Sequence, residues 1–434
     1  MEDIIYLDNN GTTNMSADVR YAMSIDIRGN ASSTGIYGEK ANNIMTKCKQ
    51  IIADHFGVDP EKYQIIFTSG ASESNNSIIN SAVNMHIKYK KSKDIPIVIS
   101  TLYEHKTSHD CLNNLEEFGK CKIIQLKPNS RGLIEPSDLL NLFKYLTHIG
   151  SLQRVCLVTI MHVNNEIGSK NAINQIGNIC KQFNVPLHSD IVQSIKFNRV
   201  NMDLLDAISV SFHKFGGPKS VGLLIFNKKI FTRYLPLVCG SQQDGFRGGT
   251  ENVNLIFGST IALMNNARDR ELKNIRIEII RNEMLKILSS YFDTFYYHEL
   301  DMYKHKINMS KPTAIIFGPR NKEWRNPNTI YFAISGGKQD TFNNDIVIKA
   351  LNEKQIIISK GSTCNSKTLK PSSALAALKV KQCLLSRSFR ISLGDENLNY
   401  PEKTINAMHD VCKTIINLIY SSYKYHTNTH GQIV

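Results

Sequence analysis

The chain has 434 residues, of which 41% are hydrophobic and 21% are charged. These values are typical of a soluble globular protein with a large core, and the length favours two domains. No apolar run approaches the roughly 18 residues that a membrane-spanning helix needs, which excludes that class of protein. The formal net charge of +14 is compatible with a nucleic acid, an acidic protein partner or a solvated basic surface, and it does not decide among them.

The N-terminus and the cysteines indicate a cytoplasmic protein without a structural metal. A strand-like apolar segment directly follows Met1, Glu2 and Asp3, so we expect neither a signal peptide nor a transit peptide. The nine cysteines are scattered, with no Cys-x-x-Cys pair. This spacing argues against a disulfide framework or a zinc site and fits a reducing compartment.

Between about residues 60 and 230, short apolar segments alternate with helical patterns such as Ser74–Lys90. This alternation predicts an α/β domain with a mostly parallel sheet, whose ligand lies at the carboxyl ends of the strands. The predicted strands are Gln64–Thr68, Pro96–Ser100, Lys122–Leu126, Val155–Ile160, Val185–His188, Ala207–Phe212 and Gly222–Phe226.

Beyond about residue 260 the pattern changes to that of an α+β domain. We expect a large domain of residues 15–258 and a smaller one formed by residues 1–14 and 259–434. Residues 293–325 show no clear periodicity and are predicted to be irregular. The other predicted elements are a linking helix near 259–291, strands near 329–334 and 355–359, and helices near 373–379 and 401–420.

Lys214 is the most informative single residue. It emerges from a predicted strand beside His213 and before a Gly-Gly-Pro turn, where a lysine can form a Schiff base, although most lysines are merely solvated. The segment around Ala71 and Ser72 follows a strand and opens a helix. Its amide groups and the helix dipole would face an anion such as phosphate, and an ordinary capped helix start is the alternative. Ser211 and His213 could supply further donors.

Polar residues at the other strand ends fit the same site. Asp190 closes a strand and could hold a pyridinium nitrogen protonated, or could cap a helix; Gln193 follows three residues later. His105 is placed to cover a ring or move a proton, or lies on the surface. Asn164 and Asn165 can donate hydrogen bonds or serve turn chemistry.

Two residues of the C-terminal half complete the pattern. Arg390 lies in the strand-like segment SFRISLG and needs an anionic partner, which is either a substrate carboxylate or an internal salt bridge. Cys364 lies among Gly, Ser, Thr and Asn residues, where an accessible thiol can act as a nucleophile, although an isolated cysteine is usually structural. Together these residues predict a pyridoxal-phosphate enzyme that handles sulfur.

The chain resembles the class V, fold-type I pyridoxal-phosphate enzymes, and within them the cysteine desulfurases of the NifS/IscS type, as a divergent NifS-like member. This resemblance implies a large domain with a mostly parallel seven-stranded sheet flanked by helices, plus a smaller α+β domain. The matching motifs occur in family order and are LDNNGTT (7–13), GNASS (29–33), FTSGASESNN (67–76), EHK (104–106), MHVNNEIG (161–168), HSDIVQS (188–194), SFHKFGGPKS (211–220), RGGTENV (247–253), PNT (327–329), GSTCNS (361–366) and SFRISLG (388–394).

The resemblance also implies roles for the matching positions. Lys214 would bind pyridoxal 5′-phosphate covalently and act as a base, His105 would stack on its ring, and Asp190 would pair with the pyridine nitrogen. Cys364 would carry the persulfide. The phosphate would be held by Ala71, Ser72, Ser211 and His213, together with Thr250 from the second subunit of a homodimer. The ring hydroxyl region would be contacted by Asn165 and Gln193. The substrate carboxylate would be bound by Asn30, Asn165 and Arg390.

The implied activity is removal of sulfur from L-cysteine, which gives L-alanine and a persulfide on Cys364 for an acceptor in iron-sulfur cluster assembly or tRNA thiolation. Phe212 departs from the family pattern, because it replaces a small residue next to the phosphate. The rival hypotheses are a selenocysteine lyase, a non-catalytic sulfur-relay or scaffold protein of the same fold, and an RNA-associated protein. We expect an acceptor protein that the sequence does not identify, and nucleic acid only through tRNA thiolation.

Overall fold

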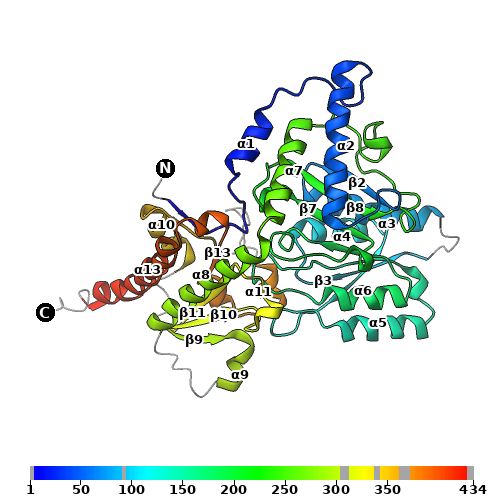
Figure 1. Cartoon of the computed structure of the whole chain (residues 1–434). Coiled ribbons are helices and arrows are strands. Elements are labelled where there is room, and N and C mark those ends of the chain that lie inside the picture. The colour runs from blue at the N-terminus through cyan, green and yellow to red at the C-terminus, as the bar shows by residue number, and fades with distance from the viewer. Residues whose placement is uncertain (1–3, 90–93, 304–311, 337–342, 361–371, 428–434) are drawn as a thin grey trace.

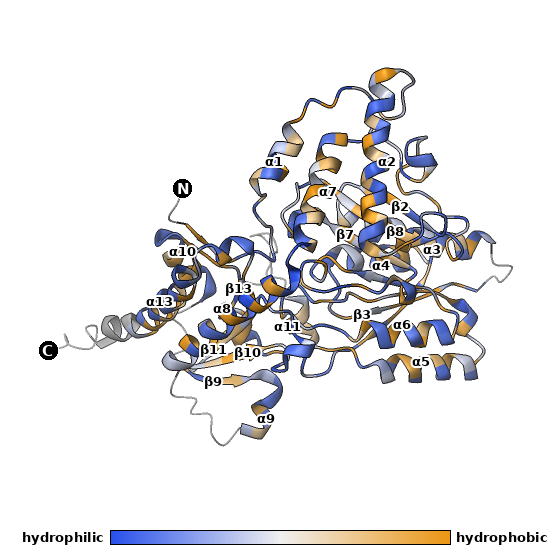
Figure 2. Cartoon of the chain, in the orientation of Figure 1, coloured by the Kyte–Doolittle hydropathy of each residue, from blue (hydrophilic) through white to orange (hydrophobic). Residues whose placement is uncertain are grey.

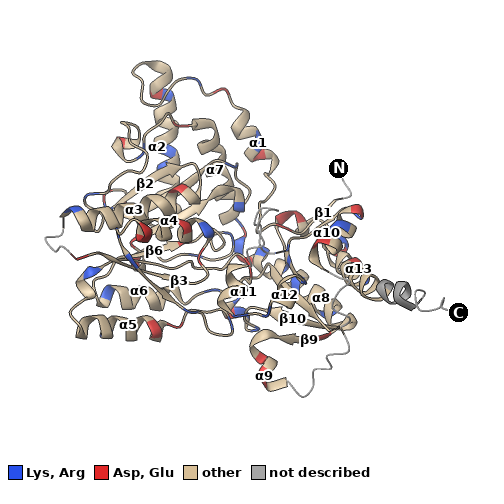
Figure 3. Ribbon diagram, turned by 180° about the vertical axis from the view of Figure 1, so that it is seen from behind, with Lys and Arg blue, Asp and Glu red and all other residues tan. Residues whose placement is uncertain are grey.

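A computed structural model describes residues 4–89, 94–303, 312–336, 343–360 and 372–427 of the chain. Figure 1 shows a larger part around a seven-stranded sheet and a smaller part around a four-stranded sheet, with the first strand and the last helix of the described residues in the smaller part. No helix among the described residues is long and apolar enough to cross a membrane. Figure 3 shows acidic and basic residues spread over both parts of the molecule.

The seven-stranded sheet has the strand order β2-β8-β7-β6-β5-β3-β4. Strand β8 is antiparallel to both of its neighbours, and the remaining pairs are parallel. The prediction of a mostly parallel seven-stranded sheet is therefore confirmed. The strands are β2 (Tyr63–Thr68), β3 (Ile97–Thr101), β4 (Lys122–Leu126), β5 (Val155–Thr159), β6 (Leu187–Asp190), β7 (Ala207–Ser211) and β8 (Gly222–Asn227).

Helices cover both faces of this sheet because successive strand residues point to opposite sides. Ile65 and Phe67 of β2 face the core beneath α2, α5, α6 and α7, whereas Ile66 faces the core beneath α3 and α4. Figure 2 shows the apolar residues gathered where helices and strands meet. The helices of this part are α1 (Ala17–Ser24), α2 (Ile36–Phe56), α3 (Ala71–Tyr89), α4 (Lys106–Glu117), α5 (Pro136–His148), α6 (Ile173–Gln182) and α7 (Val253–Ala267).

The smaller part is built around a sheet of order β13-β11-β10-β9, and β1 pairs in parallel with β12. One face of the four-stranded sheet packs on α8, α10 and α13, while Ile315 and Tyr331 on its other face join the core of the larger part. The elements are β1 (Ile5–Tyr6), α8 (Arg270–Tyr291), β9 (Asp293–Tyr296), α9 (Leu300–Tyr303), β10 (Thr313–Phe317), β11 (Thr329–Ser335), α10 (Asn344–Glu353), β12 (Ile356–Ile357), α11 (Ser373–Ala377), α12 (Gln382–Leu385), β13 (Ser388–Ser392) and α13 (Pro401–Thr427).

Two predictions for the C-terminal half are wrong. The segment 259–291 is not one helix, because α7 ends at Ala267 and α8 begins at Arg270, with Asp269 left-handed at φ 56° between them. The segment 293–325 is not irregular, because it contains β9 and β10. Strand β10 is buried along its whole length, so it is apolar on both faces and lacks the alternation that marks a strand.

The two-domain division stays a proposal. The predicted boundary between residues 258 and 259 lies inside α7, which packs against α1 and α2. The N-terminal strand β1 lies with the smaller part, since it pairs with β12.

Candidate active site

Lys214 lies just past the C-terminal end of β7, in the 3-10 turn Phe212–Lys214. Its Nζ donates hydrogen bonds to the carbonyl oxygens of Asn10, at 2.8 Å, and Gly11, at 2.6 Å. Burial and, to a smaller extent, the nearby Arg390 cation lower the pKa of the Lys214 amine to about 8, against the opposing charges of Asp8 and Asp190. A lysine with this pKa is partly neutral near physiological pH, which suits an amine that reacts as a nucleophile or a base.

Asp190 ends the neighbouring strand β6 and is buried. Its carboxylate accepts hydrogen bonds from the backbone N–H of Val192, at 3.0 Å, and from Nδ2 of Asn75, at 2.8 Å. The residues after Asp190 form turns, so it does not cap a helix. A buried carboxylate whose partners are neutral N–H groups can accept one further, charged donor.

Ala71 and Ser72 form the first turn of α3, which begins directly after β2 and the left-handed Gly70. The first-turn amides of a helix have no partner within the helix, and with the helix dipole they favour an anion. Gly222 lies against this turn, where a Cβ atom on it would approach the carbonyl carbon of Gly70 to 2.4 Å. The amides of this turn could therefore hold an anion.

Ser211 and His213 flank the turn that carries Lys214. Ser211 is buried, and His213 Nδ1 lies 3.0 Å from Thr12 Oγ1. Burial and the neighbouring lysines lower the pKa of His213 to about 4, so its ring is neutral at physiological pH. Phe212 is fully buried in the core and packs against Phe215, with ring centroids 5.4 Å apart. The core thus accommodates the bulky ring of Phe212.

His105 caps the N-terminus of α4, where its Nδ1 accepts a hydrogen bond from the backbone N–H of Thr107. Desolvation lowers the pKa of His105, Asp190 opposes that change, and Lys214 adds to it. These three residues therefore lie close enough to act on one another's charge. The preceding residue, Glu104, is buried, and its pKa is raised to about 8 by burial.

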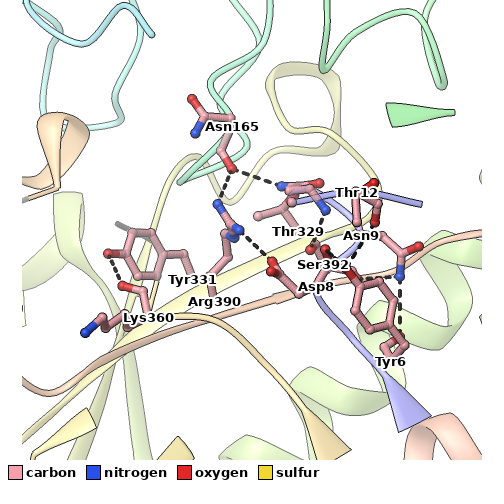
Figure 4. Close-up of polar contacts among 12 residues, drawn as sticks. Tyr6, Asp8, Asn9, Thr12, Asn165, Thr329, Tyr331, Lys360, Arg390 and Ser392 are labelled. Carbon is pink, nitrogen blue, oxygen red and sulfur yellow. Dashed lines mark hydrogen bonds and ion pairs between the residues drawn. The ribbon is translucent and has the colours of Figure 1, made fainter. Parts of the chain in front are cut away.

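Arg390 lies on β13 with its side chain only 2% exposed. Its Nη2 donates to Asp8 Oδ1 at 2.6 Å, and its Nη1 donates to the backbone oxygen of Asn165 at 3.2 Å (Figure 4). The internal salt bridge considered from the sequence is therefore present. Figure 4 also shows the side chain of Asn165 pointing away from Arg390. Gln193 reaches the same turn, because its Nε2 donates to the oxygen of Asn10 at 3.1 Å.

Of the predicted site residues that the structure describes, Asn30 and Thr250 are not brought to this cluster. Asn30 lies in the loop between α1 and α2, where its Oδ1 accepts from the N–H of Ser32. Thr250 is exposed and lines a surface hollow together with Gly29. Cys364 lies outside the described residues.

Sequence reasoning missed Asp8, Asn10 and Asn75 as site residues. The sequence signal for Asn75 is its place in the strand-to-helix motif 67–76, and the structure shows that it is fully buried. Asp8 and Asn10 lie in LDNNGTT, but their partners are far along the chain. Asn164 serves turn chemistry, since its Oδ1 accepts from the backbone N–H groups of Glu166 and Ile167.

Comparison with known proteins identifies the family. The sequence profile of the aminotransferase class-V family matches residues 5–399. The chain belongs to the class-V aminotransferase family. Pyridoxal 5′-phosphate is the cofactor of this class-V protein, and the residues present fit it: a lysine amine, a buried carboxylate, a histidine ring and a helix N-terminus meet at one edge of the sheet.

Named relatives match this class-V chain over most of its length. A cysteine desulfurase IscS of Dictyoglomus turgidum is 30% identical over 425 residues, which cover 96% of this chain and 97% of the relative. An IscS of Rickettsia prowazekii is 31% identical over 90% of this chain and 86% of the relative. Among solved structures, a NifS-like protein has a TM-score of 0.75 at 26% identity, over 94% of this chain and 99% of that one. A structure titled SspA in complex with cysteine has a TM-score of 0.66 at 27% identity, over 89% and 98%.

Proposed function

We propose that this chain is a pyridoxal-phosphate-dependent cysteine desulfurase that uses Cys364 as its sulfur carrier. The observation that carries the proposal is that Lys214 and Arg390 bond to one turn of the N-terminal segment, while the charge of Asp190 acts on Lys214. An amine, an acceptor for a ring nitrogen and a cation for a carboxylate are the groups that an amino-acid substrate and this cofactor require. The relatives named cysteine desulfurase, matched over at least 90% of this chain, favour desulfuration of cysteine over the other reactions of this cofactor.

Lys214, Asp190 and Arg390 have different roles in the proposed reaction. Bound pyridoxal phosphate supplies an electron sink that stabilises negative charge at the α-carbon of an amino acid. The Lys214 amine, with its pKa lowered to about 8, takes the proton from that carbon. Asp190 would accept a hydrogen bond from the ring nitrogen, and Arg390 would bind the substrate carboxylate.

Cys364 completes the reaction in this proposal. Its thiolate forms an S–S bond with the substrate sulfur while the C–S bond breaks. The electron pair of the broken bond stays with the carbon skeleton, and a proton added there yields L-alanine. The products are L-alanine and a Cys364 persulfide, from which an acceptor protein takes the sulfur.

The test is a Cys364→Ser variant of the purified holoenzyme. It should bind pyridoxal phosphate and change its absorption spectrum on addition of L-cysteine, because neither step uses the thiol. Release of L-alanine should fall by about a hundredfold or more, since the nucleophile is gone. Cys239→Ser is the control, because it removes an exposed thiol elsewhere in the chain, and it should keep wild-type activity. Near-normal alanine production by Cys364→Ser would contradict the proposal.

We further propose that the active unit is a cytoplasmic homodimer in which the partner subunit's Thr250 completes the phosphate site. Thr250 is exposed and lines a hollow with Gly29 of the loop between α1 and α2, and these two helices carry the exposed apolar side chains of Tyr21, at 72%, and Ile36, at 71%. Such side chains are what a second subunit would cover. Cysteines buried in the core as small apolar groups, such as Cys48 and Cys180, support a reducing compartment.

A further inference from the structure

One turn of the N-terminal segment binds both cations of the site. The side chain of Asp8 pairs with Arg390 at 2.6 Å. Two and three residues later, the carbonyl oxygens of Asn10 and Gly11 accept hydrogen bonds from Lys214 Nζ. Residues 8–11 therefore bind both Lys214 and Arg390. A ligand that displaces either cation from these residues removes one of the contacts that hold the turn.

The backbone of this turn is fixed on the strand that carries Arg390. Asp8 forms a parallel bridge with Ser392. The backbone N–H of Asn9 donates to the oxygen of Ser392 at 3.1 Å, and that of Asn10 donates to Ser392 Oγ at 2.8 Å. Ser392 and Arg390 are two residues apart on β13, so their side chains leave the strand on the same face. The Asp8 carboxylate is thereby aligned with the Arg390 guanidinium (Figure 4).

Both terminal nitrogens of Arg390 already have oxygen partners. Nη2 holds the Asp8 carboxylate and Nη1 holds the backbone oxygen of Asn165. A nearly buried guanidinium needs a counter-ion, so Asp8 stabilises the cation while no substrate is bound. A carboxylate binds arginine best through two parallel N–H···O bonds. A second carboxylate on the same face would meet the Asp8 charge, and like charges at that range repel.

We propose that Asp8 is the resident counter-ion of Arg390 and that an amino acid binds by exchanging its own carboxylate for that of Asp8. The Asp8 side chain remains 18% exposed, so water can solvate it once Arg390 releases it. The exchange makes Asp8 a specificity-determining residue, because only a ligand with a carboxylate can replace it. This inference rests on the proposed function, since it concerns how that site takes its substrate.

The test measures equilibrium binding of L-alanine and of ethylamine, which is L-alanine without its carboxylate, to the holoenzyme through the cofactor absorption. In the Asp8→Asn variant L-alanine should bind about tenfold more tightly, the equivalent of one charge-assisted hydrogen bond no longer displaced. Ethylamine should bind equally to both proteins, which also shows that the variant is folded. Asp59→Asn removes a surface carboxylate that pairs with Lys62 and should change neither value.

Weaker or unchanged L-alanine binding by Asp8→Asn, with ethylamine binding intact, would overturn the exchange and leave Asp8 only a support for Arg390. A crystal structure of the wild-type holoenzyme with L-alanine gives a test that needs no variant. Exchange requires Asp8 Oδ1 to lie farther than about 3.5 Å from Arg390 Nη2, beyond hydrogen-bonding distance. An Asp8–Arg390 pair still in contact there would contradict it. If the wild-type protein bound no L-alanine at all, the proposed function itself would fail.

Discussion

Two regions of this molecule carry residues expected to serve one site, and they differ in how they are held. The inner cluster of Asp190, Lys214 and Arg390 lies on β6, just after β7 and on β13, and each side chain has hydrogen-bond partners from other segments. The outer pair of Asn30 and Thr250 lies in loops on the exterior, and the described hydrogen bonds join neither of them to the inner cluster.

The difference separates the site residues that one chain brings together by itself from those that need a second surface. Strand ends and a packed N-terminal turn fix the inner cluster before any ligand arrives, which is the preorganisation that catalysis needs. The outer pair gains a role at a site only if another surface brings it there. A second subunit, as proposed above, would supply that surface.

The largest expected effect concerns the inner cluster. Lys214→Ala should abolish covalent attachment of pyridoxal phosphate, because it removes the amine at the end of β7. Borohydride reduction followed by mass spectrometry should find no cofactor on the variant. Lys219→Ala, an exposed lysine of the same segment, should retain it fully. A reducible cofactor bond in Lys214→Ala would show that the inner cluster is assigned to the wrong lysine.

A second effect, smaller but graded, follows from the burial of the inner cluster. Because the pKa of Lys214 is lowered to about 8, its amine loses its proton as the pH rises through that value. The rate of cofactor attachment to the apoenzyme should therefore increase about tenfold per pH unit below 8 and level off above it. Stopped-flow absorbance would measure this profile. A rate that still increased toward pH 10 would mean that the pKa of Lys214 is that of an ordinary solvated lysine, near 10.4, and that burial does not lower it.

The smallest effect is expected for the outer pair. Thr250→Ala should weaken retention of pyridoxal phosphate about tenfold, the loss of one hydroxyl hydrogen bond to a charged group. Dimers that mix Thr250→Ala and Lys214→Ala subunits would show which subunit supplies the threonine. If Thr250 acts across the dimer, one of the two mixed sites has both native residues and should hold the cofactor as the wild type does. Retention no better than that of the Thr250→Ala homodimer would place the threonine in its own subunit's site.

Much of the fold follows from local patterns in the sequence. All seven strands of the large sheet lie within two residues of their predicted bounds at each end, because each is a short apolar run between polar turns. Strand β10 and the break at Asp269 were missed for opposite reasons. Strand β10 is buried on both faces and lacks the alternation of apolar and polar residues that marks a strand. The break at Asp269 interrupts a segment whose composition is helical on both sides of it.

The site was predictable where its residues follow strands, and not where its geometry depends on distant contacts. Lys214 and Asp190 are recognisable because each ends a buried strand. The partner of Arg390 is Asp8, which lies 382 residues away in the chain, and no local pattern relates the two. The positions of Asn30 and Thr250 relative to Lys214 likewise depend on how loops pack on the exterior, for which side-chain periodicity gives no signal.

The pairing of the N-terminal segment with β12 and β13 also sets an order of events during protein synthesis. Ile5 and Tyr6 pair with Ile356 and Ile357, and Asn9 bonds to Ser392. Residues 5–9 must therefore wait until residues 356–392 have been synthesised. At about 5–20 residues per second that interval is roughly 20–80 s, during which Arg390 has not yet been made. The nascent chain thus carries Lys214 well before it can hold an amino acid, and the enzyme becomes competent only when the N-terminal segment meets β12 and β13.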